Sequence, residues 1–331
     1  MDRESLNSSI VADVISSAID SAKLLTTIAR PTISREVLVM GGKFQLTVVG
    51  GDNNMVDEMA AYLIRLESLW SRFDPHSEIS ELNNSEGASV HVHPETMVLV
   101  EALIDGWSIT GGKFDPTTLP VTVANGFATS RIDAERTTVL PTSAVWPGEM
   151  QGIRLNKSKS TVTLPRGTTL DAGGIGKGLA ADMTVALAMQ LGATGAMVSA
   201  NGDVVVDGES PDGNSWRIGI EHPLNPELEI GQVRLTKGAV VTSSRTRQVW
   251  MHKGADQHHL IDAATGKAAR TPILSATVIA SSGAIAEVQA KLPFVMDLEQ
   301  SFLEITQHGS QVAAVDESMM MHTSSGWERY L

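Results

Sequence analysis

The chain has 331 residues, 42% of them hydrophobic, and this composition is typical of a packed globular protein. Its formal net charge of −13 excludes a general nucleic-acid binder, because phosphate contacts need clustered lysine and arginine. The absence of cysteine excludes disulfides, thiolate metal sites and cysteine nucleophiles, so we expect a cytoplasmic protein. No window approaches the ~20 apolar residues of a transmembrane helix, and the first residues lack the pattern of a standard secretion signal.

The first predicted element is an amphipathic helix, because apolar residues such as Ile15 and Ile19 are spaced as on one helical face. It should end before Pro31, whose ring disfavours helical backbone at the residue before it. We therefore expect a helical extension over residues 1–35 and a single domain over residues 36–331.

Within that domain, strands and helices are predicted from the spacing of apolar residues. Alternation predicts strands over residues 36–49, and three- and four-residue spacing predicts a helix over residues 56–70. Further strands are expected within residues 150–170, 197–207, 215–220, 231–243 and 272–281, with helices over 177–190 and from about Ala284. Because strands and helices do not alternate regularly, the predicted fold class is α+β rather than a doubly wound parallel sheet.

A glycine-rich run over residues 170–182 leads directly into a predicted helix. Backbone N–H groups at such a junction can approach phosphate oxygens, and the helix N-terminus and Lys177 add positive potential. The spacing is neither GxGxxG nor that of a P-loop, so a tight turn without a ligand is the alternative.

A second run begins with His258 and His259 and places His259 three residues before Asp262, ahead of a Thr-Gly turn. The residues alone leave open which of the two histidines faces a cleft. A histidine could remove a proton from an attacking hydroxyl, and a nearby carboxylate could orient it, although a structural surface cluster is the alternative. Residues 241–245, which include Ser243, add hydroxyls and a guanidinium that could hold an anion or simply end a polar strand.

Six short motifs, read together, resemble the ApbE-type FAD:protein FMN transferases over about residues 36–300. In chain order they are Met40-Gly41; Ser71-Arg72-Phe73-Asp74-Pro75 with residues 77–83; residues 112–117; residues 171–178; Asn201-Gly202-Asp203; and residues 259–266. The resemblance implies a T-fold-related mixed sheet. It also implies cleavage of FAD, transfer of FMN through a phosphoester bond to a threonine or serine of a target flavoprotein, and release of AMP.

The resemblance also implies roles for individual residues. It makes His259 the general base and Asp262 its support, and it places Mg²⁺ at Glu287 and a backbone carbonyl near Gly176. The residues implied to bind FAD are Met40, Phe114, Asp115, Thr117, Asp171, Gly173, Gly174, Lys177, Ser243 and Lys291.

The chain departs from the family pattern at Glu287 and Lys291, where many members have aspartate and threonine as metal ligands. Lysine cannot bind a metal ion, because an ammonium group has no lone pair. Residues four apart share a helical face, which predicts a Glu287–Lys291 ion pair, worth roughly 0.3–0.5 kcal/mol if it is exposed. The sharper hypothesis places the Lys291 ammonium where the metal would sit, facing the FAD pyrophosphate.

Two rival functions follow from the same site. One is a non-catalytic FAD carrier or sensor in which Lys291 holds the pyrophosphate, and the other is an FAD pyrophosphatase in which water replaces the acceptor hydroxyl. Pro293 also falls in the last predicted helix, where it should cause a kink or an early end.

Overall fold

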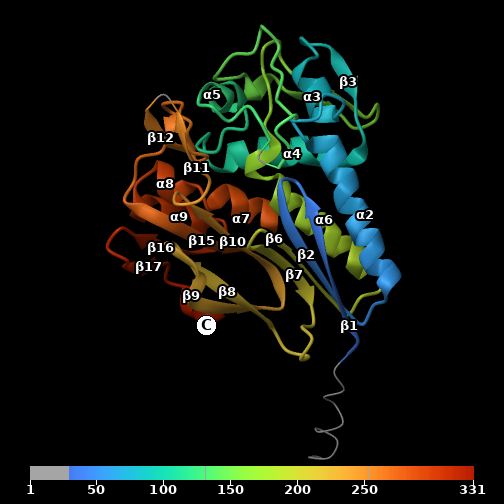
Figure 1. The fold of residues 1–331 in the computed structure, drawn as a ribbon, viewed down its shortest axis with the longest axis vertical. Coiled ribbons are helices and arrows are strands. Elements are labelled where there is room, and N and C mark those ends of the chain that lie inside the picture. The colour runs from blue at the N-terminus through green and yellow to red at the C-terminus, as the bar shows by residue number, and fades with distance from the viewer. Residues whose placement is uncertain (1–29, 131, 253) are drawn as a thin grey trace, which may run out of the picture.

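The computed structural model describes residues 30–130, 132–252 and 254–331, so the helix expected at the N-terminus lies outside the described residues. The centre of the molecule is an eight-stranded sheet in which every neighbouring pair of strands is antiparallel (Figure 1). The strand order is β1 (Thr32–Val39), β2 (Gly42–Val49), β6 (Gly195–Ala200), β7 (Asp203–Gly208), β10 (Lys237–Ser244), β15 (Ile273–Ala280), β16 (Gln311–Asp316) and β17 (Met321–Thr323). The α+β prediction is therefore confirmed.

Helices cover one face of this sheet, as Figure 1 shows for α2 and α6. The covering helices are α2 (Asn53–Trp70), α6 (Gly176–Gln190) and α7 (Gly283–Gln289), and α4 (Pro94–Ile109) packs against α2 and α7. The main hydrophobic core lies between them and the sheet, where α2 buries residues such as Leu63 and Leu66 against strand residues such as Leu46. The helices predicted over 56–70 and 177–190 are confirmed as α2 and α6.

A two-stranded ribbon, β8 (Trp216–His222) and β9 (Asn225–Leu235), covers the opposite face. Its inward-facing residues, including Trp216, Ile218 and Val233, form a second core with sheet residues such as Val240. Trp327, in η3 (Trp327–Tyr330), packs into the same cluster. The sheet is therefore buried on both faces.

The remaining elements lie beyond one end of the sheet and frame its edge (Figure 1). They are α3 (Glu78–Asn83), β3 (Ser89–His91), α5 (Leu119–Ala124), η1 (Met150–Gly152), β4 (Arg154–Asn156), β5 (Thr161–Thr163), η2 (Ala172–Gly174), β11 (Val249–His252), β12 (Ala255–His258), β13 (Ile261–Asp262) and β14 (Lys267–Ala268). Two short helices, α8 (Leu292–Val295) and α9 (Leu298–Gln307), pack instead against β15 and β16. Asn83 fixes α3 to the glycine-rich run, because its side chain donates to the Leu170 carbonyl and accepts from the Leu170 N–H.

Two boundaries refine the sequence expectations. β1 begins at Thr32, so part of the segment assigned to the extension pairs in the sheet. The last predicted helix does end early, because α7 stops at Gln289 and α8 starts at Leu292 with Pro293 in its first turn. No helix in the described ranges combines the length and apolar character that a bilayer crossing needs.

The helices α6 and α7, which carry Lys177 and Glu287, approach each other at Gly178 and Gly283. A Cβ added to Gly178 would lie 2.4 Å from the Gly283 carbonyl oxygen and 3.0 Å from the Ala284 nitrogen. These are backbone atoms, so neither can rotate away as a side chain would. Glycine at this position therefore sets the spacing between α6 and α7.

We predict that Gly178→Ala destabilises the fold by about 1–3 kcal/mol, because overpacking outweighs the gain of up to about 1 kcal/mol in helix propensity. Urea unfolding followed by circular dichroism measures the change. Gly231→Ala is the matched control, since its added Cβ would meet only the Ile220 side chain, at 3.8 Å. Equal midpoints for the two variants would contradict the close-approach argument.

Candidate functional site

A cleft of about 800 Å³ opens where the glycine-rich run meets the end of the sheet. Its walls come from segments that are far apart in the sequence, so only folding brings them together. Lining residues come from the ranges 41–45, 113–118, 171–177, 199–203, 241–248 and 259–261, with Thr122, Phe127, Glu221, Glu287, Lys291 and Val295. The residues predicted from sequence that line it are Phe114, Asp115, Asp171, Gly173, Gly174, Lys177, Ser243, His259, Glu287 and Lys291.

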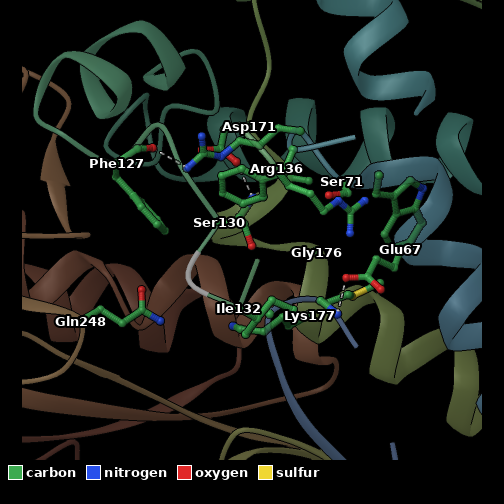
Figure 2. A pocket seen from close by; sticks show the side chains of 17 residues that line it. Glu67, Ser71, Phe127, Ser130, Ile132, Arg136, Asp171, Gly176, Lys177 and Gln248 are labelled. Atoms are coloured by element: carbon green, nitrogen blue, oxygen red, sulfur yellow. Dashed lines mark hydrogen bonds and ion pairs between the residues drawn. The ribbon is translucent and has the colours of Figure 1, made fainter. Parts of the chain in front are cut away.

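A smaller side pocket of about 190 Å³ adjoins the cleft (Figure 2). Figure 2 shows Phe127 and Asp171 on one side of it and Gln248 and Lys177 on the other. The predicted residues Met40 and Gly176 line this pocket rather than the cleft. Both spaces are lined by Gly41, Phe127, Asp171, Gly173, Lys177 and Gln248, so these six residues form their common boundary.

Arg72 lines the side pocket and holds the start of the glycine turn. Its guanidinium lies 4.2 Å from the Phe73 ring centroid and 4.9 Å from that of Phe127, a cation–π arrangement on both sides. It also lies 3.3 Å from the Asp171 carboxylate and donates to the Phe127 carbonyl and the Thr138 hydroxyl. Asp171 in turn accepts from the Gly173 N–H at 2.8 Å, so a buried arginine fixes the shape of the turn.

Lys177, in the first turn of α6, is held by two carboxylates. Its Nζ donates to Glu287 at 2.7 Å and to Asp203 at 3.3 Å. The second Glu287 oxygen accepts from the Gly178 N–H at 2.9 Å, and the second Asp203 oxygen accepts from the Thr242 N–H. Because Glu287 is only 3% exposed, this pair joins α6, α7 and the sheet in a buried network.

The charged groups in this network shift one another's pKa values. Burial disfavours the charged form of Lys177, yet the Glu287 and Asp203 carboxylates hold its pKa above the ordinary value. Burial raises the pKa of Asp203, whereas Lys177 and Lys291 outweigh burial at Glu287 and lower its pKa. We therefore describe Lys177 as an ammonium and Glu287 as a carboxylate near neutral pH.

Lys291 does not make the ion pair that its position four residues after Glu287 predicts. Its Nζ donates to the backbone carbonyl of Glu287 and to that of Gly174, both at 2.7 Å. The Glu287 carboxylate turns instead to Lys177, which reaches it from another helix. The exposed salt bridge predicted from sequence is therefore wrong, because a buried carboxylate needs a partner inside the fold.

Comparison with known proteins agrees with this arrangement. The model of the ApbE family matches residues 40–315. The chain belongs to the ApbE family. Proteins named FAD:protein FMN transferase are similar to it: one from Vibrio cholerae is 26% identical over 83% of this chain and 78% of that protein. One from Klebsiella pneumoniae is 26% identical over 81% of this chain and 80% of that protein.

Solved ApbE structures share the fold of this chain. The ApbE protein of Thermotoga maritima superposes with a TM-score of 0.79 over 91% of this chain and 99% of its own, at 24% sequence identity. The flavin transferase ApbE of Vibrio cholerae gives a TM-score of 0.75 over 91% and 100% of the two chains, at 20% identity. The family resemblance stated from the sequence motifs is thus confirmed.

Other predicted residues of this ApbE-family chain lie around the cleft rather than in its lining. Thr117 is fully buried and donates through its hydroxyl to Asp115 at 2.7 Å, which stiffens the loop behind Phe114. Asp262 accepts from the Ala264 N–H and the Thr265 hydroxyl in the turn that follows His259.

Sequence reasoning assigned no role to several residues that shape the site. Arg72 and Asp203 stood inside recognised motifs, and their contacts to Asp171 and Lys177 required the structure. Phe127 and Gln248, which line both cavities, lie in stretches that carried no motif.

The residues present do not fit a divalent metal ion. Over residues 30–130, 132–252 and 254–331, no group of three or more histidine, cysteine, aspartate or glutamate side chains is arranged to hold one. The Glu287 carboxylate is engaged by Lys177 and Gly178, and the carbonyl of Gly174 is engaged by an ammonium group. The carbonyl near Gly176, the first residue of α6, was the other ligand that the resemblance implied. A Mg²⁺ ion beside Glu287 and Gly174 would lie close to the ammonium groups of Lys177 and Lys291.

Asp182 links α6 to the start of α7, because its carboxylate accepts from the Gly283 and Ala284 N–H groups. Burial raises its pKa from the ordinary 3.8 to about 6. The folded state thus holds this proton more tightly than the unfolded state. The resulting stability is fully present below pH 3.8 and is lost as the pH rises through 6.

We therefore predict that, between pH 4 and pH 7, the free energy of unfolding of the wild type falls by roughly 1–2 kcal/mol relative to that of Asp182→Asn. The asparagine variant has a constant defect, because its amide can accept only one of the two N–H groups, but no titration at this position. Urea unfolding at several pH values measures the difference. A difference that does not change with pH would contradict the assignment.

Proposed function

We propose that this chain is an FAD:protein FMN transferase that attaches FMN by a phosphoester bond to a threonine or serine of a target flavoprotein and releases AMP. The main support for this function is that one cleft is lined by His259, the glycine turn and the side chains of Lys177 and Lys291. A base, a phosphate-binding turn and positive charge are what phosphoryl transfer to a hydroxyl requires. Relatives with this name match about four fifths of the chain, which supports the same activity.

FAD binds, in this proposal, with its pyrophosphate at the turn from Asp171 to Lys177. Backbone N–H groups near the start of α6 and the Lys177 ammonium supply positive potential toward the phosphates. The partners of Lys177 hold it in place, because Glu287 and Asp203 restrict its side chain while leaving it charged. Phe114 and Ser243 complete the lining, and Met40 contributes from the side pocket.

The transfer step uses the acceptor hydroxyl as the nucleophile. His259 takes the hydroxyl proton while the oxygen attacks the phosphorus of the FMN half. The new oxygen–phosphorus bond replaces the pyrophosphate bond, and AMP leaves with the bridging oxygen. Asp262 acts on His259 through the turn that its carboxylate holds at Ala264 and Thr265.

The cellular location and the target protein stay predictions. A cytoplasmic location is predicted from the lack of cysteine and from the residue pattern of the chain. The target flavoprotein is defined only by its chemistry, an accessible threonine or serine hydroxyl that enters the cleft beside His259.

We predict that His259→Ala lowers FMN transfer by at least about 100-fold, since a positioned general base contributes about 10²–10⁴-fold. The measurement is the intact mass of a threonine-bearing FMN-acceptor domain after incubation with the protein and FAD, with AMP quantified in parallel. His308→Ala is the matched control, because His308 is an exposed residue at the end of α9.

Three results separate this function from its rivals. One FMN added per acceptor, with equal AMP, supports the transferase. AMP released without acceptor indicates a pyrophosphatase. FAD that stays bound and intact with every acceptor hydroxyl tested indicates a carrier and contradicts the proposal.

A further inference from the structure

Two backbone carbonyls from different elements converge on one point in the cleft. They belong to Gly174, in η2, and to Glu287, in α7, and both lie 2.7 Å from the Lys291 Nζ. Carbonyl oxygens that face a common point form a cation site, since each directs partial negative charge at it. In this chain a side-chain ammonium already occupies that site.

The local structure explains why the lysine reaches this point. α7 ends at Gln289, so the Glu287 carbonyl is one of the last in the helix. Positive side chains near a helix C-terminus favourably satisfy such carbonyls. Lys291 lies two residues after the helix end, and its side chain folds back over the last turn to reach the Glu287 carbonyl.

The Lys291 side chain also packs closely against Phe114 and Gly174. The Lys291 Nζ lies 5.7 Å from the Phe114 ring centroid, within cation–π range. A Cβ added to Gly174 would meet Phe114 at 2.9 Å and the Lys291 Cε at 3.2 Å. Glycine at position 174 therefore leaves the space that admits the lysine and its aromatic neighbour.

We propose that the Lys291 ammonium is the built-in cation of the FAD phosphate site and takes the place of a divalent ion, so that FAD binding needs no metal. Two of its three N–H donors hold Gly174 and Glu287, and the third serves a phosphate oxygen of the ligand in the cleft that Lys291 lines. Its extension to metal-free FMN transfer rests on the proposed function.

The surrounding charges favour this arrangement over a bound metal. The Glu287 carboxylate, the acidic group of α7 nearest the site, is already paired with Lys177 and the Gly178 N–H. A divalent ion added beside Lys291 would face the repulsion of two ammonium groups. Because Lys177 is paired with Glu287 and Asp203, the additional positive charge for a phosphate comes from Lys291, whose Nζ donates to two uncharged carbonyls.

The first test compares FAD affinity in metal-free buffer with EDTA and in buffer with Mg²⁺, measured by quenching of flavin fluorescence. Wild type should bind FAD with the same Kd, within about twofold, in both buffers. Lys291→Met keeps the stem but removes the charge, so its Kd in EDTA should rise about 10–100-fold. Lys157→Met is the matched control, because Lys157 is an exposed lysine paired with Glu101 outside the cleft.

A second variant tests whether the site is a cation site. Lys291→Thr removes the ammonium and offers a hydroxyl oxygen beside the Gly174 and Glu287 carbonyls. Its FAD affinity should be weak in EDTA and should recover at least about tenfold with Mg²⁺, whereas Lys291→Met should recover less. Thermal melting of both variants checks that each one is folded.

The outcomes separate the two proposals. A wild type that loses FAD affinity tenfold in EDTA, or a folded Lys291→Met that binds FAD like wild type, overturns the role of Lys291. Metal-independent FAD binding without FMN transfer to any acceptor contradicts the proposed function and leaves the cation role standing. FMN transfer by wild type in EDTA supports both.

Discussion

The ion pair between Lys177 and the buried carboxylate of Glu287 is the interaction on which the site depends. It joins the first turn of α6 to α7, at a place where Gly178 lets the two helices touch. Loss of the Lys177 ammonium would be strongly destabilising, because it would leave the Glu287 carboxylate, which is only 3% exposed, without its charged partner. The same contact that holds the helices together therefore fixes the ammonium of Lys177 at the glycine turn.

Around this pair the cleft balances positive and negative groups within a short distance. Arg72 faces Asp171, Lys177 faces Glu287 and Asp203, and Lys291 faces two carbonyl oxygens. A chain with a net charge of −13 can bind an anionic dinucleotide only through such a local concentration of donors. The proposals for FAD binding and for Lys291 both follow from this fixed set of charges.

Much of this was predictable from sequence because it is local. Apolar spacing predicted α2 and α6, the ring of Pro293 predicted the early end of α7, and ordered motifs gave the family. The family resemblance named ten residues that line the cleft. The side pocket was not foreseen, since Phe127 and Gln248 reach it from segments without a motif.

The sequence by itself determined the element types, the α+β class, the family and the unusual lysine at position 291. Only the tertiary structure decided which charges meet. Spacing along one helix predicted that Glu287 would pair with Lys291, but the Glu287 carboxylate lies buried against α6 and pairs with Lys177. Helical periodicity describes neighbours on one surface, whereas the partner of a buried charge comes from whichever element packs against it. Because Glu287 pairs with Lys177, the Lys291 ammonium donates instead to the backbone carbonyls of Gly174 and Glu287.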